Sequence, residues 1–154
     1  TDNISAIGID KRTEKFNTCN ENGADFSVSP MENDLKNKIA DYSKSHDLDV
    51  VIDFVSSKSS LELGCSILGK GGRLVTLGGS GEQFLANSAD MLVKELELIG
   101  SRYCTKQELK ESLDLYARGL IEPLVSVKTD FDGAEGLHDK IEKGEIIGRA
   151  GILI

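Results

Sequence analysis

Asp10 is the first residue of the chain whose type and position suit chemistry. It ends the short apolar run at residues 4–9 (ISAIGI), which predicts a buried strand. In nucleotide-binding α/β folds, an acid at a strand end accepts hydrogen bonds from ribose hydroxyls and repels a 2′-phosphate. Lys11, Arg12 and Lys15 follow it and would place positive charge beside the same site. The alternatives are that Asp10 caps the next helix and that these basic side chains only make a helix face soluble.

Glycines at strand ends are the second feature of interest. The chain has 16 glycines in 154 residues, about 10% against roughly 7% in average proteins. Gly78, Gly79, Ser80 and Gly81 follow an apolar run, but no capped helix comes next, which weakens the case for a phosphate cradle. The G-x-G-x-x-G turn expected about 20 residues before a ribose-binding acid is also absent, since only nine residues precede Asp10.

Catalytic and metal-binding patterns are not found in the sequence. His46 and His138 are isolated and are interpreted as solvated residues on helix surfaces. Cys65 lies on an apolar helix face and is interpreted as a small core residue, while Cys104 has no identifiable base near it. No HxxxH, CxxC, GxSxG or SxxK motif is present. We therefore predict no catalytic residue and no metal ligand in this chain.

Composition limits the partners. The formal net charge of −8 disfavours binding to nucleic acids and to anionic membranes. No apolar run approaches the 18 or so residues that span a bilayer. The three cysteines are odd in number and far apart, so we expect no disulfide framework and a cytoplasmic location.

The hydrophobic pattern alternates between short apolar runs and segments of helical period. The predicted strands are residues 4–9, 26–28, 49–55, 72–77 and 96–99, and the predicted helices are 13–22, 31–45, 59–68 and 88–95. Gly69 is predicted to close the third of these helices. Strands that alternate with helices predict an α/β fold with a doubly wound parallel sheet.

The elements after residue 100 are more mixed, and this places a domain boundary there. They are a helix at 106–117, an extended segment at 124–127, a helix at 133–143 and a strand at 150–154. We therefore divide the chain into residues 1–100 and residues 101–154.

Four stretches together resemble the C-terminal, NAD-binding portion of the zinc-type alcohol dehydrogenases, in the medium-chain dehydrogenase/reductase family. They are ISAIGIDKRTEKFNTCNENGADFSV, DVVIDFVSSKSSLELGCSILGKGGRLVTLGG, KELELIGSRYCTKQELKESLDLYARGLIEPLV and GLHDKIEKGEIIGRAGILI. The second contains the GG-R-x-V-x-x-G pattern of that family. The likeness covers nearly all of the chain, in order and at the family's spacings.

The resemblance implies a role in binding NAD for ten residues. Asp10 matches the acid that binds the adenosine ribose, and Lys15 a lysine near it. The others match the adenine wall (Phe54, Val55), the loop facing the nicotinamide (Leu77, Gly78, Gly79), a turn beside the nicotinamide ribose (Gly100, Ser101) and a basic residue that reaches the pyrophosphate (Arg149). Ser56 departs from the family, which usually has glycine there. Lys11 and Arg12 leave NADP open as the cofactor.

The resemblance also implies what lies outside this chain. The family's zinc ligands and substrate pocket belong to an N-terminal domain, and residues 101–154 return to that catalytic domain. The expected Rossmann-like sheet lacks its first strand and glycine-rich turn, and that strand is central in the usual order. We therefore expect an open position between strands 4–9 and 49–55, filled by the missing N-terminal domain or a complementary chain. A homo-oligomer is also expected.

The implied function is the cofactor-binding part of an NAD(P)-dependent alcohol dehydrogenase, an oxidoreductase that is inactive as this chain alone. One alternative is a zinc-free quinone or enoyl reductase of the same superfamily. Another is a non-catalytic nucleotide-binding or assembly module. A methyltransferase is disfavoured, because the GG-R-x-V-x-x-G block and the tail around Arg149 do not belong to that class.

Overall fold

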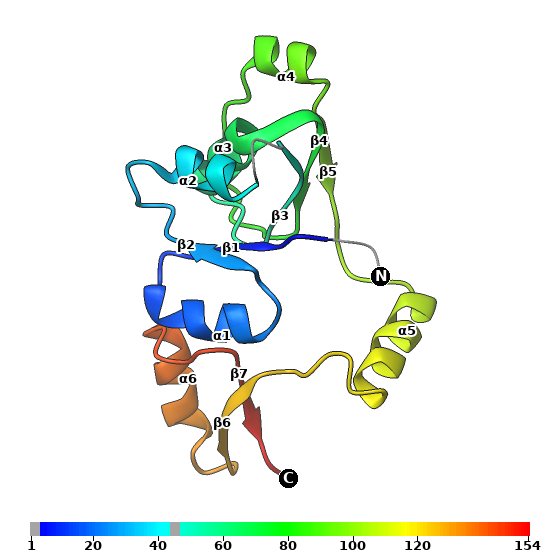
Figure 1. Ribbon diagram of the computed structural model, residues 1–154. Coiled ribbons are helices and arrows are strands. Elements are labelled where there is room, and N and C mark those ends of the chain that lie inside the picture. The colour runs from blue at the N-terminus through cyan, green and yellow to red at the C-terminus, as the bar shows by residue number, and fades with distance from the viewer. Residues whose placement is uncertain (1–3, 44–46) are drawn as a thin grey trace. The chain divides into compact units, whose positions relative to one another are not determined.

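The computed structural model describes residues 4–43 and 47–154. The chain divides into two compact units, residues 1–103 and residues 104–154. His46 and the end of the predicted helix at 31–45 lie outside the described residues. Each unit is built from parallel strands and helices (Figure 1), as the α/β prediction requires.

The first unit alternates strands and helices along its length. Its elements are β1 (Ile7–Ile9), the 3-10 turn η1 (Thr13–Lys15), α1 (Phe16–Glu21), β2 (Phe26–Val28), α2 (Leu35–Tyr42), β3 (Leu48–Asp53), α3 (Lys58–Ile67), β4 (Leu68–Thr76), α4 (Ser88–Lys94) and β5 (Glu97–Gly100). Every strand pair in it is parallel. The predicted strands and helices are therefore all present, with bounds shifted by a few residues.

The prediction that Gly69 closes α3 is wrong. The helix ends at Ile67, and Leu68 already has the extended angles φ −70° and ψ 143°. Gly69 therefore belongs to β4, which begins with no intervening loop. A Cβ on Gly69 would lie 1.9 Å from the Cβ of Asp47, so close packing explains this glycine.

The sheet of the first unit is in two parts. β1 pairs with β2, and β3, β4 and β5 form a second sheet with β4 in the middle. β1 and β3 are not hydrogen-bonded to each other, although both belong to the first unit. The two strands therefore do not pair directly, which is compatible with the open position that the sequence predicts between them.

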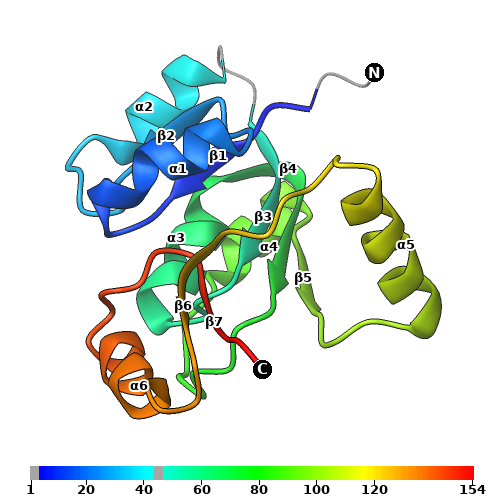
Figure 2. The ribbon, with the colours of Figure 1, turned by 90° about the horizontal axis from the view of Figure 1, so that it is seen from below.

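Two apolar clusters hold the first unit together, and α3 contributes to both. One contains Val28, Leu35 and Ile39, and Leu63 of α3 packs against it. The other contains Leu61, Leu68 and Leu74 and lies between α3 and the three-stranded sheet. Figure 2 shows α1 and α2 beside the β1–β2 pair and α3 beside β3.

The opposite face of the three-stranded sheet is largely uncovered. Ile52, Val75 and Ile99 are in register across β3, β4 and β5, and Ile52 is 55% exposed. Val50, two residues before Ile52 on the same face, is also exposed. Parallel sheets of this type normally have both faces buried.

The second unit consists of α5 (Lys106–Ala117), β6 (Val125–Thr129), α6 (Ala134–Glu142) and β7 (Arg149–Ile152). β6 and β7 pair in parallel. Thr105 begins α5 with a capping box, in which its hydroxyl accepts the N–H of Glu108 while the Glu108 carboxylate accepts the N–H of Thr105. Gly119 and Gly144 follow α5 and α6 in the left-handed region, which is typical of a glycine that ends a helix.

Two helical glycines give a matched test of this packing. A Cβ on Gly64 would lie 2.8 Å from Leu74 Cδ1 and 3.3 Å from Val51 Cγ1, whereas a Cβ on Gly136 of α6 would meet no described atom within 4 Å. We expect Gly64→Ala to lower the free energy of unfolding by about 1 kcal/mol, because overpacking outweighs the gain in helix propensity. Gly136→Ala should raise it by about 0.5–1 kcal/mol. Chemical denaturation of both variants measures this, and equal effects would contradict the packing assigned to Gly64.

Candidate functional site

The carboxyl ends of three parallel strands meet along one edge. Asp53 of β3 is in register with Thr76 of β4, and Thr76 is in register with Gly100 of β5. The residues that follow these ends include five of the predicted cofactor contacts: Phe54, Val55, Leu77, Gly78 and Gly79. Gly100 and Ser101 complete the edge, and the Ser101 N–H donates to the Thr76 carbonyl at 3.0 Å. In open α/β sheets, ligands bind outside this edge.

Asp53 organises the segment that follows β3. Its side chain is buried, with 7% of the residue exposed. One carboxylate oxygen accepts the N–H groups of Val55 (2.8 Å) and Ser56 (2.9 Å), and the other accepts the Ser60 hydroxyl (2.7 Å). A buried carboxylate is stable only when such donors surround it. These bonds turn the chain sharply and leave the side chains of Phe54 and Val55 73% and 58% exposed.

Ser56 adopts the conformation that glycine usually supplies. Its φ is 55°, in the left-handed region that L-residues rarely occupy. Although the family usually has glycine here, Ser56 keeps a backbone conformation that glycine also adopts. The Ser56 hydroxyl bonds to the Thr76 hydroxyl, and the Ser56 carbonyl accepts the Ser80 hydroxyl.

The loop after β4 is attached to the same strand end. The N–H groups of Leu77 and Gly78 both donate to the Asp53 carbonyl, at 2.9 and 3.4 Å. A Cβ on Gly78 would lie 2.6 Å from the carbonyl carbon and oxygen of Val55. Gly78 is therefore required by contact between the two loops.

No contact with another described residue requires glycine at positions 79 and 100. A Cβ on either would meet nothing within 4 Å among the described residues, and neither has a positive φ. These two positions leave the backbone open at the strand ends, where a ligand approaches most closely if no side chain intervenes. Phe54 and Val55, which are also exposed, follow the neighbouring strand end.

Asp10 and Lys15 form an ion pair directly after β1. Lys15 Nζ donates to Asp10 Oδ2 at 2.9 Å, and the Arg12 N–H donates to Asp10 Oδ1 at 2.9 Å. Partial burial raises the pKa of Asp10, but the Arg12 N–H and the Lys15 ammonium outweigh it and hold that pKa below its ordinary value of 3.8. Arg12 itself pairs with Glu14 at 2.7 Å, so its charge is partly engaged. Asp10 is thus an ionised acceptor at a strand end.

Arg149 and Cys104 belong to the second unit, and Cys19 and Cys65 lie on α1 and α3 of the first. Arg149 begins β7 of the second unit, so its contact with a pyrophosphate remains a prediction. Cys19, Cys65 and Cys104 are free thiols. Cys65 packs against the cluster of Leu61, Leu68 and Leu74, as predicted, and burial raises the pKa of its thiol.

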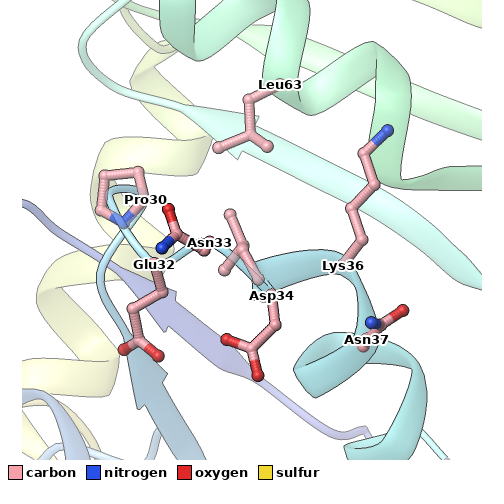
Figure 3. Close-up of a pocket in the computed structure, with 8 residues that line it drawn as sticks. Pro30, Glu32, Asn33, Asp34, Lys36, Asn37 and Leu63 are labelled. Carbon is pink, nitrogen blue, oxygen red and sulfur yellow. The ribbon is translucent and has the colours of Figure 1, made fainter.

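A separate hollow of about 390 Å³ opens beside the start of α2 (Figure 3). None of the predicted site residues lines it. In Figure 3, Leu63 of α3 enters it from the side opposite the carboxylates of Glu32 and Asp34. Its lining is Pro30, Glu32, Asn33, Asp34, Leu35, Lys36, Asn37 and Leu63. Glu32 and Asp34 both pair with Lys38, which accounts for their charges within the fold.

Residues 4–43 and 47–154 contain no group of three or more His, Cys, Asp or Glu side chains that could hold a metal ion. These residues therefore do not fit zinc. No helix in the same ranges has the length and hydropathy needed to cross a membrane. His138 is exposed on α6.

Sequence reasoning missed the residues that support the candidate site. Asp53 and Thr76 were not singled out, and Ser80 was considered only as part of the run at residues 78–81, because their hydrogen bonds depend on loops brought together only in the fold. The one signal available was Asp53 itself, an acid that interrupts the apolar run at 49–55. Such an acid is stable inside a fold only with several donors around it.

Removing the cation beside Asp10 tests its environment. We expect Lys15→Met to raise the pKa of Asp10, because partial burial remains while the ammonium is lost. Since the folded-state pKa is the lower one, the stabilisation from this pair is present above about pH 4 and is lost as the pH falls through the folded-state pKa. A ¹³C NMR titration of the carboxyl carbons measures the shift.

The control is Lys38→Met, which breaks the matched pair with Glu32 and should leave the pKa of Asp10 unchanged. An unshifted pKa of Asp10 in Lys15→Met would contradict the pairing.

Comparison with known proteins places this chain in a family. Residues 3–118 match the model of the zinc-binding dehydrogenases. An NAD-dependent alcohol dehydrogenase of Sulfurisphaera tokodaii is 24% identical over 143 residues, which are 93% of this chain and 41% of that protein. Alcohol dehydrogenase 1 of Neurospora crassa is 29% identical over 153 residues, which cover 95% of this chain and 42% of that protein. The chain thus spans about two fifths of the length of these relatives.

The fold agrees with solved structures of the same kind. The crystal structure of an alcohol dehydrogenase from Aeropyrum pernix superposes with a TM-score of 0.83 at 27% identity, covering 94% of this chain and 41% of that one. The likeness therefore extends through both units of the chain. Because the family model matches well over half of its residues, the chain belongs to the zinc-binding dehydrogenase family.

Proposed function

We propose that this chain is the cofactor-binding part of an NAD-dependent alcohol dehydrogenase, which transfers hydride between an alcohol and the nicotinamide. The relatives named as alcohol dehydrogenases support the reaction class. The observation that carries the proposal is the edge formed by Asp53, Thr76 and Gly100 in register, with open glycines and exposed apolar residues beyond it. The bound nicotinamide supplies the hydride acceptor.

The residues of this chain bind and orient the cofactor. Phe54 and Val55 offer an apolar wall for the adenine, and the ionised Asp10 accepts hydrogen bonds from the adenosine ribose. Lys15 holds Asp10 in place through their ion pair. The loop of Leu77, Gly78 and Gly79, with Gly100 and Ser101, lies against the nicotinamide half, where a missing side chain permits close approach. The proposed contact of Arg149 with the pyrophosphate rests on the resemblance alone.

We propose NAD over NADP as the cofactor. A carboxylate at the position of Asp10 repels a 2′-phosphate, and it is charged at neutral pH because its pKa lies below the ordinary value of 3.8. Arg12, which could otherwise favour a phosphate, is paired with Glu14. Lys11 is exposed and is the residue that keeps NADP as the second candidate.

The chemistry at the substrate requires parts that this chain does not provide. Zinc and the alcohol site are proposed to belong to protein beyond these residues, because the described residues do not fit a metal. The open position between β1 and β3, and the apolar face that includes Ile52, suit one further strand and a helix packed on that face. The N-terminal part of the protein or a complementary chain would supply them. Three free cysteines support a reducing, cytoplasmic setting.

Asp10→Ser tests the assignment of the ribose. In the full-length protein, the unaltered chain should support alcohol oxidation with NAD. The variant should lower kcat/KM for NAD relative to NADP by about tenfold or more, since a charged hydrogen-bond acceptor and its repulsion are both lost. Steady-state kinetics with both cofactors measures this ratio.

Asp41→Ser is the matched control, because it removes one exposed acid from α2. Its cofactor ratio should equal that of the unaltered protein. An unchanged ratio in Asp10→Ser would remove Asp10 from the ribose site, and a full-length protein without alcohol oxidation would overturn the proposed reaction.

Ile52→Lys tests whether the exposed sheet face is covered in the full-length protein. A buried cation there should lower the melting temperature by several degrees, because the charge is desolvated without a partner. Leu92→Lys changes an exposed residue of α4 and is the control. Thermal unfolding of the two full-length variants separates the cases, and equal melting temperatures would show that the face stays in contact with solvent.

A further inference from the structure

Ser56 connects three segments of the candidate site without belonging to the cofactor contacts. Its N–H donates to Asp53 at the end of β3. Its hydroxyl bonds to the hydroxyl of Thr76 at the end of β4, and its carbonyl accepts the hydroxyl of Ser80 in the next loop. With only 5% of the residue exposed, water does not replace these partners.

We propose that Ser56 and Thr76 are a positioning pair that fixes the adenine-facing loop (residues 54–56) and the nicotinamide-facing loop (residues 77–80) in one relative orientation. The inference rests on the proposed function, because it assigns these residues to the binding of a dinucleotide that contacts both loops. Neither Ser56 nor Thr76 touches the cofactor in this role. They act through Phe54 and Val55 on one side and through Gly79 on the other.

Two attachments are needed to hold one loop against another. The backbone bonds from Leu77 and Gly78 to the Asp53 carbonyl fix only the roots of the loops. Because both bonds end at the same carbonyl, one loop could still rotate relative to the other about that point. The bond from the Ser80 hydroxyl to the Ser56 carbonyl lies beyond it and removes that rotation, while the bond to Thr76 attaches the adenine-facing loop to β4 at the residue where the nicotinamide-facing loop begins.

The backbone of Ser56 supports a role for its hydroxyl. At φ 55°, glycine would adopt the same conformation without steric strain. The steric strain of a serine in this conformation is compensated by the hydrogen bonds of its hydroxyl. The one that reaches β4 is the bond to Thr76. The other acceptor within reach is the Asp53 carbonyl, at the longer distance of 3.4 Å.

A ligand that bridges both loops should depend on this pair more than a ligand that touches one. NAD⁺ contacts both loops in the proposed function, whereas AMP contacts only the adenine-facing one. The two Kd values are measured by calorimetry on the full-length protein. Thr76→Val should raise the Kd of NAD⁺ about fivefold, the effect of one lost hydrogen bond, and that of AMP by less than about twofold.

Thr76→Ser keeps a hydroxyl at the same place and should restore NAD⁺ binding to within about twofold of the unaltered protein. Ser56→Gly removes the hydroxyl and relieves the backbone, and it should weaken NAD⁺ as Thr76→Val does. Combining Ser56→Gly with Thr76→Val should add little, because both break the same bond. If Thr76→Val does not fold, Ser56→Gly carries the test with the same expectations.

The outcomes separate this inference from the function on which it rests. NAD⁺ binding that survives both Thr76→Val and Ser56→Gly overturns the positioning role and leaves the proposed function intact. Equal weakening of NAD⁺ and AMP, with a lower melting temperature, reduces the pair to general stability and also overturns it. An unaltered full-length protein that does not bind NAD⁺ overturns the proposed function itself.

Discussion

The buried carboxylate of Asp53 is the interaction on which the rest of the site depends. A charged group in that position is tolerated only because two backbone N–H groups and the Ser60 hydroxyl surround it, and bonds of this charged kind contribute about 1.5–3 kcal/mol each. The same residue offers its carbonyl to Leu77 and Gly78. The side chain and the carbonyl of Asp53 therefore hold two loops, and these loops contain the exposed residues Phe54 and Val55 and the open Gly79.

The fold of the first unit is built around a position that no described strand occupies. Residues of α3 belong to both apolar clusters. The packing of this helix therefore connects the β1–β2 pair to the three-stranded sheet, which no strand pairing joins. The fully buried apolar residues of the described chain are few, and small cores give small stability. The relatives are more than twice as long as this chain, which agrees with a sheet that further protein completes.

Most elements could be predicted from the sequence, because short apolar runs and helical spacing are local signals. The run at 49–55 and the helix at 106–117 are of this kind, and α5 has the predicted bounds. Gly69 was misassigned because glycine serves caps and close contacts alike, and only the fold brings Asp47 against it. The bonds of Ser56 to Thr76 and Ser80 join residues 20 and 24 positions apart. No periodicity indicates such pairs, so the hydrogen bonds that hold these loops could not be predicted from the sequence.

The left-handed backbone conformation of Ser56 also affects the order in which positions 56 and 76 can change during evolution. If the hydroxyl of Thr76 is lost first, Ser56 keeps its strained backbone and a buried hydroxyl with a poor acceptor. If Ser56 becomes glycine first, both burdens disappear and position 76 is then free to lose its hydroxyl. Either substitution alone breaks the bond between Ser56 and Thr76, but only glycine at 56 also relieves the backbone, so lineages are expected to pass through glycine at 56 before position 76 diversifies.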